Sequence, residues 1–123
     1  MRRDRFALAV ATTFAFGAAG CVSTHTERGT ASLAPGESRR WVVDGLNVDL
    51  EVRNAGPADV TVTAVGSGAT VPAGGEYEVG LNHAASADPI TVTIENAGVG
   101  ERAEAEWVFR GPLGWTLRES EPR

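Results

Sequence analysis

Few side chains in this 123-residue chain could carry catalysis or bind a metal ion. The chain has a single cysteine, Cys21, and two histidines, His25 and His83, and no motif brings the three together. A zinc site needs three or four nitrogen or sulfur ligands, and a blue-copper site needs two histidines and a free cysteine. We therefore predict no enzyme, no metal centre and no cofactor, and we interpret His83 as a solvated loop residue.

Oxygen donors suggest a second kind of chemistry, the binding of calcium. They gather at Asp44, Asn47 and Asp49, and Asp88 could add another. Their spacing lacks the fixed pattern and the closing glutamate of an EF-hand loop. We interpret these side chains as solvated, and the same holds for three glutamates further on, Glu101, Glu104 and Glu106.

The chain contains three tryptophans, and an exposed indole can stack on a sugar or anchor a protein partner. Trp41 and Trp107 fall within alternating apolar sets, which predicts that both belong to the core. Trp115 instead follows the turn-like stretch Gly111-Pro112-Leu113-Gly114. If any residues contact a partner, we expect them to be Leu113 and Trp115.

The first twenty residues have the organisation of an export signal. Arg2, Arg3 and Arg5 precede an apolar stretch from 6 to 19, and small residues follow it. The 14 residues of this stretch would span about 21 Å as a helix, less than the roughly 30 Å hydrocarbon core of a bilayer. A stable transmembrane helix is therefore not expected. The Arg2-Arg3 pair leaves both Sec and twin-arginine export open.

The residues Ala18, Ala19, Gly20 and Cys21 resemble a lipobox, the stretch at which prokaryotic lipoprotein signals are cleaved and lipidated. The family usually has a large aliphatic residue where this chain has Ala18. The resemblance implies cleavage after Gly20, a lipid on Cys21 and attachment of the mature chain to the extracytoplasmic face of a membrane. Two alternatives remain open: an ordinary cleaved signal followed by a free Cys21, and a short N-terminal helix with a buried cysteine.

Cleavage would make the chain more acidic. Three arginines and one aspartate lie within residues 1–20, so the remaining 103 residues carry a net charge of −7, compared with −5 for the whole chain. An acidic protein is poorly suited to neutralising phosphates. We expect no nucleic-acid partner, and the expected partners are the membrane and a protein of the cell envelope.

Apolar alternation begins only after a polar segment. Residues 21–32 are polar and without apolar periodicity, which predicts a tether. Alternating residues then predict strands. The pattern is strictest over 46–53, where Leu46, Val48, Leu50 and Val52 share one face. It recurs at 60–64, 77–81, 90–94 and 102–109, with shorter strands expected at 41–43 and 115–117.

About seven short strands and no convincing helix predict an all-β chain with a single antiparallel β-sandwich. The expected organisation is a signal peptide over 1–20, a tether over 21–32, the sandwich over 33–118 and a polar tail over 119–123.

Two turn motifs occur twice. A Pro-Gly turn precedes a strand within 33–38, a related turn does so within 71–76, and Asn-Ala-Gly ends a strand at 54–56 and 96–98. These residue types favour tight turns and left-handed backbone angles. Over roughly 33–117 the pattern resembles prokaryotic immunoglobulin-like modules such as the CARDB and ASPM-SPD-2-Hydin-like groups, which implies an immunoglobulin-like sandwich. Convergent turn chemistry and a duplicated half-sandwich both remain open explanations of the repetition.

Two hypotheses about function follow. The first is a non-enzymatic, lipid-anchored extracytoplasmic domain with a structural or protein-binding role at the cell envelope. The alternative is a lipoprotein that binds a sugar, a small solute or calcium through loops at one end of the sandwich. Thermal stabilisation by a ligand would favour the alternative.

Overall fold

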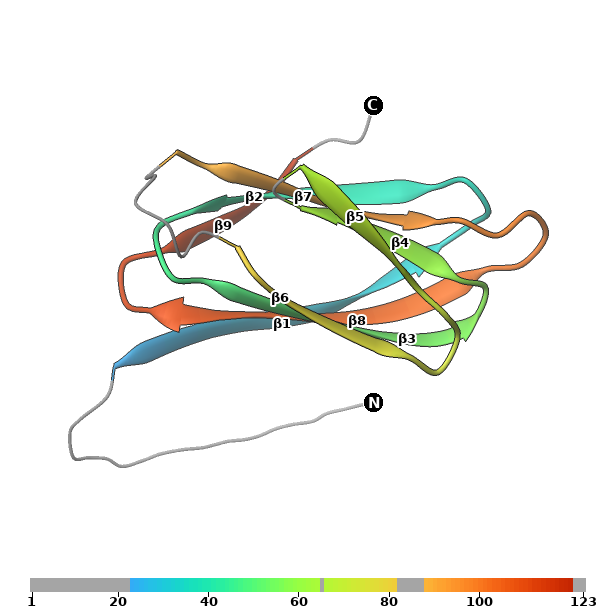
Figure 1. Ribbon diagram of the computed structural model, residues 1–123, viewed down its shortest axis with the longest axis horizontal. Helices are drawn as coiled ribbons and strands as arrows, with labels where there is room; N and C mark the ends of the chain where they lie inside the picture. Colours follow the sequence, from blue (N-terminus) through green and yellow to red (C-terminus); the bar gives the residue numbers. More distant parts are fainter. Residues whose placement is uncertain (1–22, 65, 82–87, 121–123) are drawn as a thin grey trace.

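The computed structural model describes residues 23–64, 66–81 and 88–120. Within these residues there are nine strands and no helix. The strands are β1 (Thr24–Leu33), β2 (Ser38–Asp44), β3 (Asp49–Pro57), β4 (Val60–Ala64), β5 (Ser67–Val71), β6 (Glu76–Gly80), β7 (Ile90–Asn96), β8 (Ala103–Pro112) and β9 (Thr116–Ser120). They form two sheets packed face to face (Figure 1).

One sheet has four strands in the order β1-β8-β3-β6, and the other has five in the order β5-β4-β7-β2-β9. Every pairing within them is antiparallel. Strands β1 to β4 alternate between the sheets, β4 and β5 form a hairpin, and β5 to β8 alternate again. The first eight strands thus pair first with last, second with seventh, third with sixth and fourth with fifth, which is a jelly-roll connectivity.

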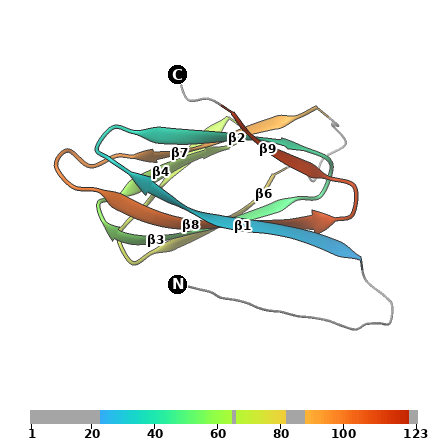
Figure 2. The same ribbon diagram turned by 180° about the vertical axis from the view of Figure 1, so that it is seen from behind.

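The expected single antiparallel β-sandwich is confirmed. Its strand order differs from that of the immunoglobulin-like sandwich that the resemblance implied, because an immunoglobulin sandwich places its first two strands side by side in one sheet. Here β1 and β2 lie in different sheets (Figure 2). The difference arises at residues 34–37, where the Pro-Gly turn carries the chain from one sheet to the other instead of closing a hairpin.

The core lies between the two sheets and is built by the alternation seen in the sequence. Trp41 and Trp107 are 1% and 8% exposed, so their expected place in the core is confirmed. Their ring centroids lie 5.2 Å apart, and Phe109 lies 5.5 Å from Trp107. These separations are typical of aromatic pairs that contribute stability beyond their buried area.

The segment expected to be a tether is largely a strand. All ten residues of β1 pair with β8, from Thr24 opposite Pro112 to Leu33 opposite Ala103. Its polar residues alternate with small or half-buried ones, and Gly29 lies against the indole of Trp107. Strand β1 forms the edge of its sheet, and over residues 24–30 every second side chain is only half-buried. Apolar side chains are not needed at those positions, so the sequence shows no apolar alternation there. Residues 24–32 therefore belong to the sandwich and not to a tether.

Two further strands differ from the expectation. The expected tail at 119–123 begins inside β9, which pairs Glu119 with Trp41 and Ser120 with Arg40 of β2. Strand β5 was not expected, because its small residues show no apolar alternation. Its pairing with β4 along all five residues supplies the hydrogen bonds that hold it in place.

The repeated motifs contact each other within each sheet, at the ends of neighbouring strands. Asn96 donates its main-chain N–H to the carbonyl of Glu37 at 2.9 Å, and Gly36 donates to the carbonyl of Asn96 at 3.2 Å. In the other half, Asn54 donates to the carbonyl of Gly75 at 2.9 Å, and Gly74 donates to the carbonyl of Asn54 at 2.6 Å. Each Asn-Ala-Gly segment thus holds one of the turns that change sheets.

Candidate functional site

Leu113 and Trp115, which were expected to contact a partner, belong to the turn between β8 and β9. This turn and the start of β1 lie at the end of the sandwich seen on the left of Figure 1, which we call the β1-start end. It comprises the start of β1 at Thr24, the turn between β2 and β3 at 45–48 and the turn between β8 and β9 at 113–115. Register places Thr24 opposite Pro112 in one sheet and Asp44 opposite Thr116 in the other. The two turns and the start of β1 are therefore neighbours.

Trp115 is buried at this end, with 4% of its surface exposed. Its indole Nε1 donates a hydrogen bond to the main-chain carbonyl of His25 at 3.0 Å, and the two rings meet edge to face at 5.0 Å. A Cβ added at Gly45 would lie 2.5 Å from the Cβ of Trp115, so the turn after β2 packs directly on this residue. Trp115 was expected to contact a partner, but its side chain is buried and supports the turns from inside, so it leaves little surface for such a contact.

Leu113, by contrast, is 63% exposed at the tip of its turn. Leu46 is also exposed, at 41%, although the alternation from 46 to 53 placed it on a buried face. The strand begins later, at Asp49, since Gly45 and Asn47 adopt positive φ angles of 136° and 61° and turn the chain outward. Val48, the next residue of the alternating set, is fully buried as expected.

Sequence reasoning missed Leu46 as a candidate surface residue. The local signal was present in Asp44-Gly45-Leu46-Asn47, since glycine and asparagine are the residues that tolerate the left-handed backbone angles of tight turns. A continuous apolar alternation across the turn outweighed that signal. The structure thus brings Leu46 and Leu113 to one end and removes Trp115 from the surface.

His25 is placed on β1, beside this end. Its Nε2 lies 2.9 Å from Oε2 of Glu27, two residues along the same side of the strand, and both side chains are 40% exposed. In the part of the chain that the structure describes, no three histidine, cysteine, aspartate or glutamate side chains come together to hold a metal ion. The contact between His25 and Glu27 therefore lies at the partly exposed surface of β1.

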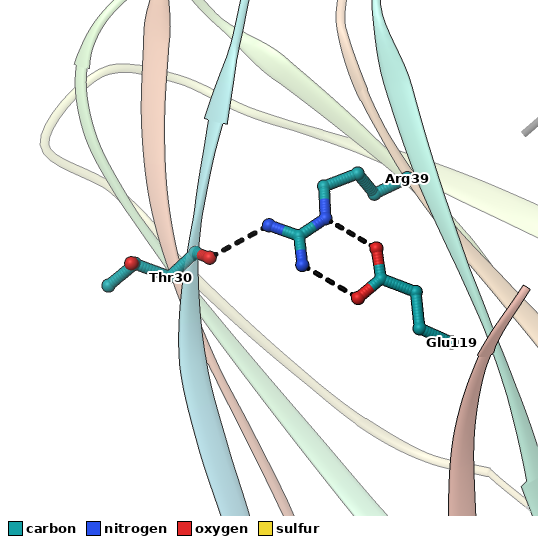
Figure 3. A network of polar contacts seen from close by, with 3 residues as sticks. All are labelled: Thr30, Arg39 and Glu119. Atoms are coloured by element: carbon teal, nitrogen blue, oxygen red, sulfur yellow. Dashed lines mark hydrogen bonds and ion pairs between the residues drawn. The ribbon is translucent and has the colours of Figure 1, made fainter. Parts of the chain in front are cut away.

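Farther along β1, a network of polar contacts joins the edges of the two sheets (Figure 3). Arg39 donates from Nε and Nη2 to the two carboxylate oxygens of Glu119, both at 2.7 Å, and from Nη1 to the carbonyl of Thr30 at 2.9 Å. The hydrogen bond and charge of Arg39 lower the pKa of the Glu119 carboxyl against the opposing effect of burial. The hydrogen bond to Glu119 likewise raises the pKa of Arg39. This network ties β1 of one sheet to β2 and β9 of the other.

The outward face of the four-stranded sheet is highly charged. Its shallow hollow of about 360 Å³ is lined by acidic and basic side chains together with Val108. The charged lining residues are Asp49, Glu51, Glu78 and Arg110. An ion pair between Arg53 and Glu76, at 3.1 Å, lies on the same sheet. Opposite charges alternate over this surface, which is typical of a solvated sheet face.

Several sequence-predicted residues lie outside the described parts of the chain. They are Ala18, Ala19, Gly20, Cys21 and His83. Within the described parts, no helix has the length and apolar character needed to cross a membrane.

Comparison of the chain with protein-family models, with curated proteins and with solved structures gives no match. The case for a function therefore stands on the chain's own residues and fold.

Proposed function

We propose that the chain is a lipid-anchored extracytoplasmic protein, attached to a membrane through Cys21, whose β-sandwich has a structural or protein-binding role at the cell envelope. The observation that carries the proposal is the lipobox-like stretch Ala18-Ala19-Gly20-Cys21 at the end of an apolar signal segment. Its position relative to the folded domain adds support. Because β1 begins at Thr24, cleavage before Cys21 would remove the signal and leave the sandwich whole.

The chemistry of the anchor accounts for the only thiol in the chain. Lipidation would transfer a diacylglyceryl group from a phospholipid donor to Sγ of Cys21: the C–S thioether bond forms as the glyceryl C–O bond to phosphate breaks, and the phosphate headgroup leaves with the thiol proton. Hydrolysis of the Gly20-Cys21 peptide bond would then free a new N-terminus. The single cysteine would then have no remaining redox or metal-binding role.

Mass spectrometry of the N-terminal peptide from native membranes tests the proposal. We expect a peptide that begins at residue 21 and carries a diacylglyceryl group on Cys21. Cys21→Ser should abolish the modification and leave the protein unprocessed or released. A matched control combines Cys21→Ser with Ser23→Cys, which keeps one thiol but moves it two residues from the cleavage point, and should also lack lipid. An unmodified Cys21 in a soluble secreted protein would overturn the proposal.

A further inference from the structure

We propose that the β1-start end of the sandwich faces the bilayer and that Leu46 and Leu113 lie in the membrane interface. The inference rests on the proposed function, since it takes Cys21 as the point of lipid attachment. It adds the face of the protein that meets the lipid and the two side chains that enter it.

A lipid on Cys21 would hold the start of β1 close to the membrane. Cys21 is three residues before Thr24, and three extended residues span at most about 10 Å. The start of β1 is therefore held close to the membrane surface. Strand β1 then runs away from this end for ten residues, about 33 Å, toward Leu33. The opposite end of the sandwich can reach the bilayer only if the molecule lies on its side.

The two orientations would present different surfaces to the lipid. Lying on the outward face of the four-stranded sheet would bring Glu51, Glu78 and Arg110 against lipid, and removing such charges from water is costly. The β1-start end also carries exposed aspartates, Asp44, Asp49 and Asp88, but two of the three exposed large apolar side chains of the described residues, Leu46 and Leu113, lie on its turns. Pro112, beside Leu113, is exposed and has no main-chain N–H that would lose its water on insertion.

Both turns that carry the exposed leucines are connected to the first residues of β1. The hydrogen bond from Trp115 Nε1 to the carbonyl of His25 ties the turn that carries Leu113 to the first residues of β1. The close approach of Gly45 to Trp115 ties the turn that carries Leu46 to the same indole. A lipid three residues before β1 would therefore hold both leucines near the bilayer at once.

The negative charge of the protein bears on which lipid headgroups its β1-start end can approach. The mature chain would carry a net charge of −7, and Asp44 is exposed at this end. Anionic headgroups would repel such a surface. We therefore assign a zwitterionic bilayer, such as phosphatidylcholine, as the partner of the β1-start end.

Quenching by brominated lipids tests the orientation. Leu113→Trp and Leu46→Trp each place a reporter at the proposed interface, whereas Val99→Trp places one at a fully exposed apolar position in the connection between β7 and β8, at the opposite end. The lipidated full mature protein is reconstituted into phosphatidylcholine vesicles with brominated acyl chains. Unsubstituted protein, with its three buried tryptophans, sets the baseline. Equal melting temperatures confirm that the variants fold alike.

We expect the emission of Leu113→Trp and Leu46→Trp to fall below the baseline in brominated vesicles, and that of Val99→Trp to remain at it. Equal quenching at 99 and 113, or no loss at 113 beyond the baseline, would overturn the inference.

A second preparation separates this result from the proposed function. The chain from residue 21 is coupled through Cys21 to a maleimide phospholipid and measured in the same vesicles. If native Cys21 carries lipid but 113 is not quenched, the anchor stands and the orientation is wrong. If native Cys21 carries no lipid, the proposed function is wrong, and quenching in the coupled chain still decides the orientation that an anchor at Cys21 imposes.

Discussion

Asn54 and Asn96 occupy equivalent positions in the two halves of the sandwich. Asn54 Nδ2 donates to the carbonyls of Ala58 and Val71 at 2.8 and 2.9 Å, and its Oδ1 accepts from the N–H of Gly56 at 2.7 Å. Asn96 repeats the arrangement with different partners. Its Nδ2 donates to the carbonyls of Leu33 and Glu101 at 3.0 and 2.7 Å, and its Oδ1 accepts from the N–H of Gly98 at 2.7 Å.

The repetition of the motifs has a physical reason in this arrangement. Val71 and Leu33 each end the strand that leads into a turn between sheets, and one buried asparagine accepts and donates at each crossing. A buried carbonyl without a donor is costly, so both crossings need a side chain with two N–H groups and one acceptor.

Replacing either asparagine by alanine should destabilise the fold strongly. Asn54→Ala or Asn96→Ala leaves two main-chain carbonyls and one N–H without their partner. Since each unsatisfied buried group costs about 1–3 kcal/mol, we expect a loss of about 3 kcal/mol or more in the free energy of unfolding. Urea denaturation measures the change. Thr63→Ala, at an exposed strand position, is the control and should change stability by less than about 0.5 kcal/mol. A similar loss in all three variants would contradict the role of the asparagines.

Gly29 should not tolerate a methyl group. A Cβ at this position would lie 2.5 Å from Cζ2 of Trp107, inside the aromatic core. We expect Gly29→Ala to cost roughly 1–3 kcal/mol, because the indole must shift against its neighbours. Gly100→Ala is a matched control, since a Cβ there meets nothing within 4 Å and the residue does not adopt a positive φ. Equal melting temperatures for the two variants would show that Trp107 can move freely.

Truncation of Trp115 should destabilise the fold, whereas truncation of Leu113 should leave its stability nearly unchanged. Trp115→Ala removes a buried indole and its hydrogen bond to β1, and we expect a loss of about 3–5 kcal/mol. Leu113→Ser acts on an exposed turn tip and should stay within about 0.5 kcal/mol of the unsubstituted protein. Thermal unfolding of the soluble domain without lipid measures both. Comparable losses would mean that Leu113 also packs in the core.

The ion pair between Arg39 and Glu119 should make stability depend on acidity. Arg39 lowers the pKa of Glu119 from its ordinary 4.5, so the folded state holds this carboxylate ionised more readily than the unfolded state does. The contribution is therefore complete above pH 4.5 and is lost as the pH falls through the lowered value.

We expect Glu119→Gln to cost about 0.5–1 kcal/mol at pH 7, the range for a solvent-screened pair, and nothing at a pH below the lowered pKa. Urea denaturation across pH measures the difference, with Glu95→Gln on neighbouring β7 as the control. High salt should shrink the effect at pH 7. A difference that grows toward low pH would refute the assigned sign.

Local patterns in the sequence determined much of the fold. The alternation of Val48, Leu50 and Val52, and that over 90–94 and 103–109, predicted the buried faces because successive residues of a strand point to opposite sides. Pro-Gly and Asn-Ala-Gly marked the turns because their residue types favour particular backbone angles wherever they occur. The resemblance of 18–21 to a lipobox was equally local.

Only the tertiary structure decided what depends on residues far apart in the chain. Strand β1 exists because β8, about 80 residues later, pairs with it, and no local periodicity records that pairing. The Pro-Gly turns change sheets because buried Asn96 and Asn54 hold them from other strands. Trp115 is buried and Leu46 is exposed because the turns at 45–48 and 113–115 pack together around the indole of Trp115. The local sequence of either turn does not show that contact.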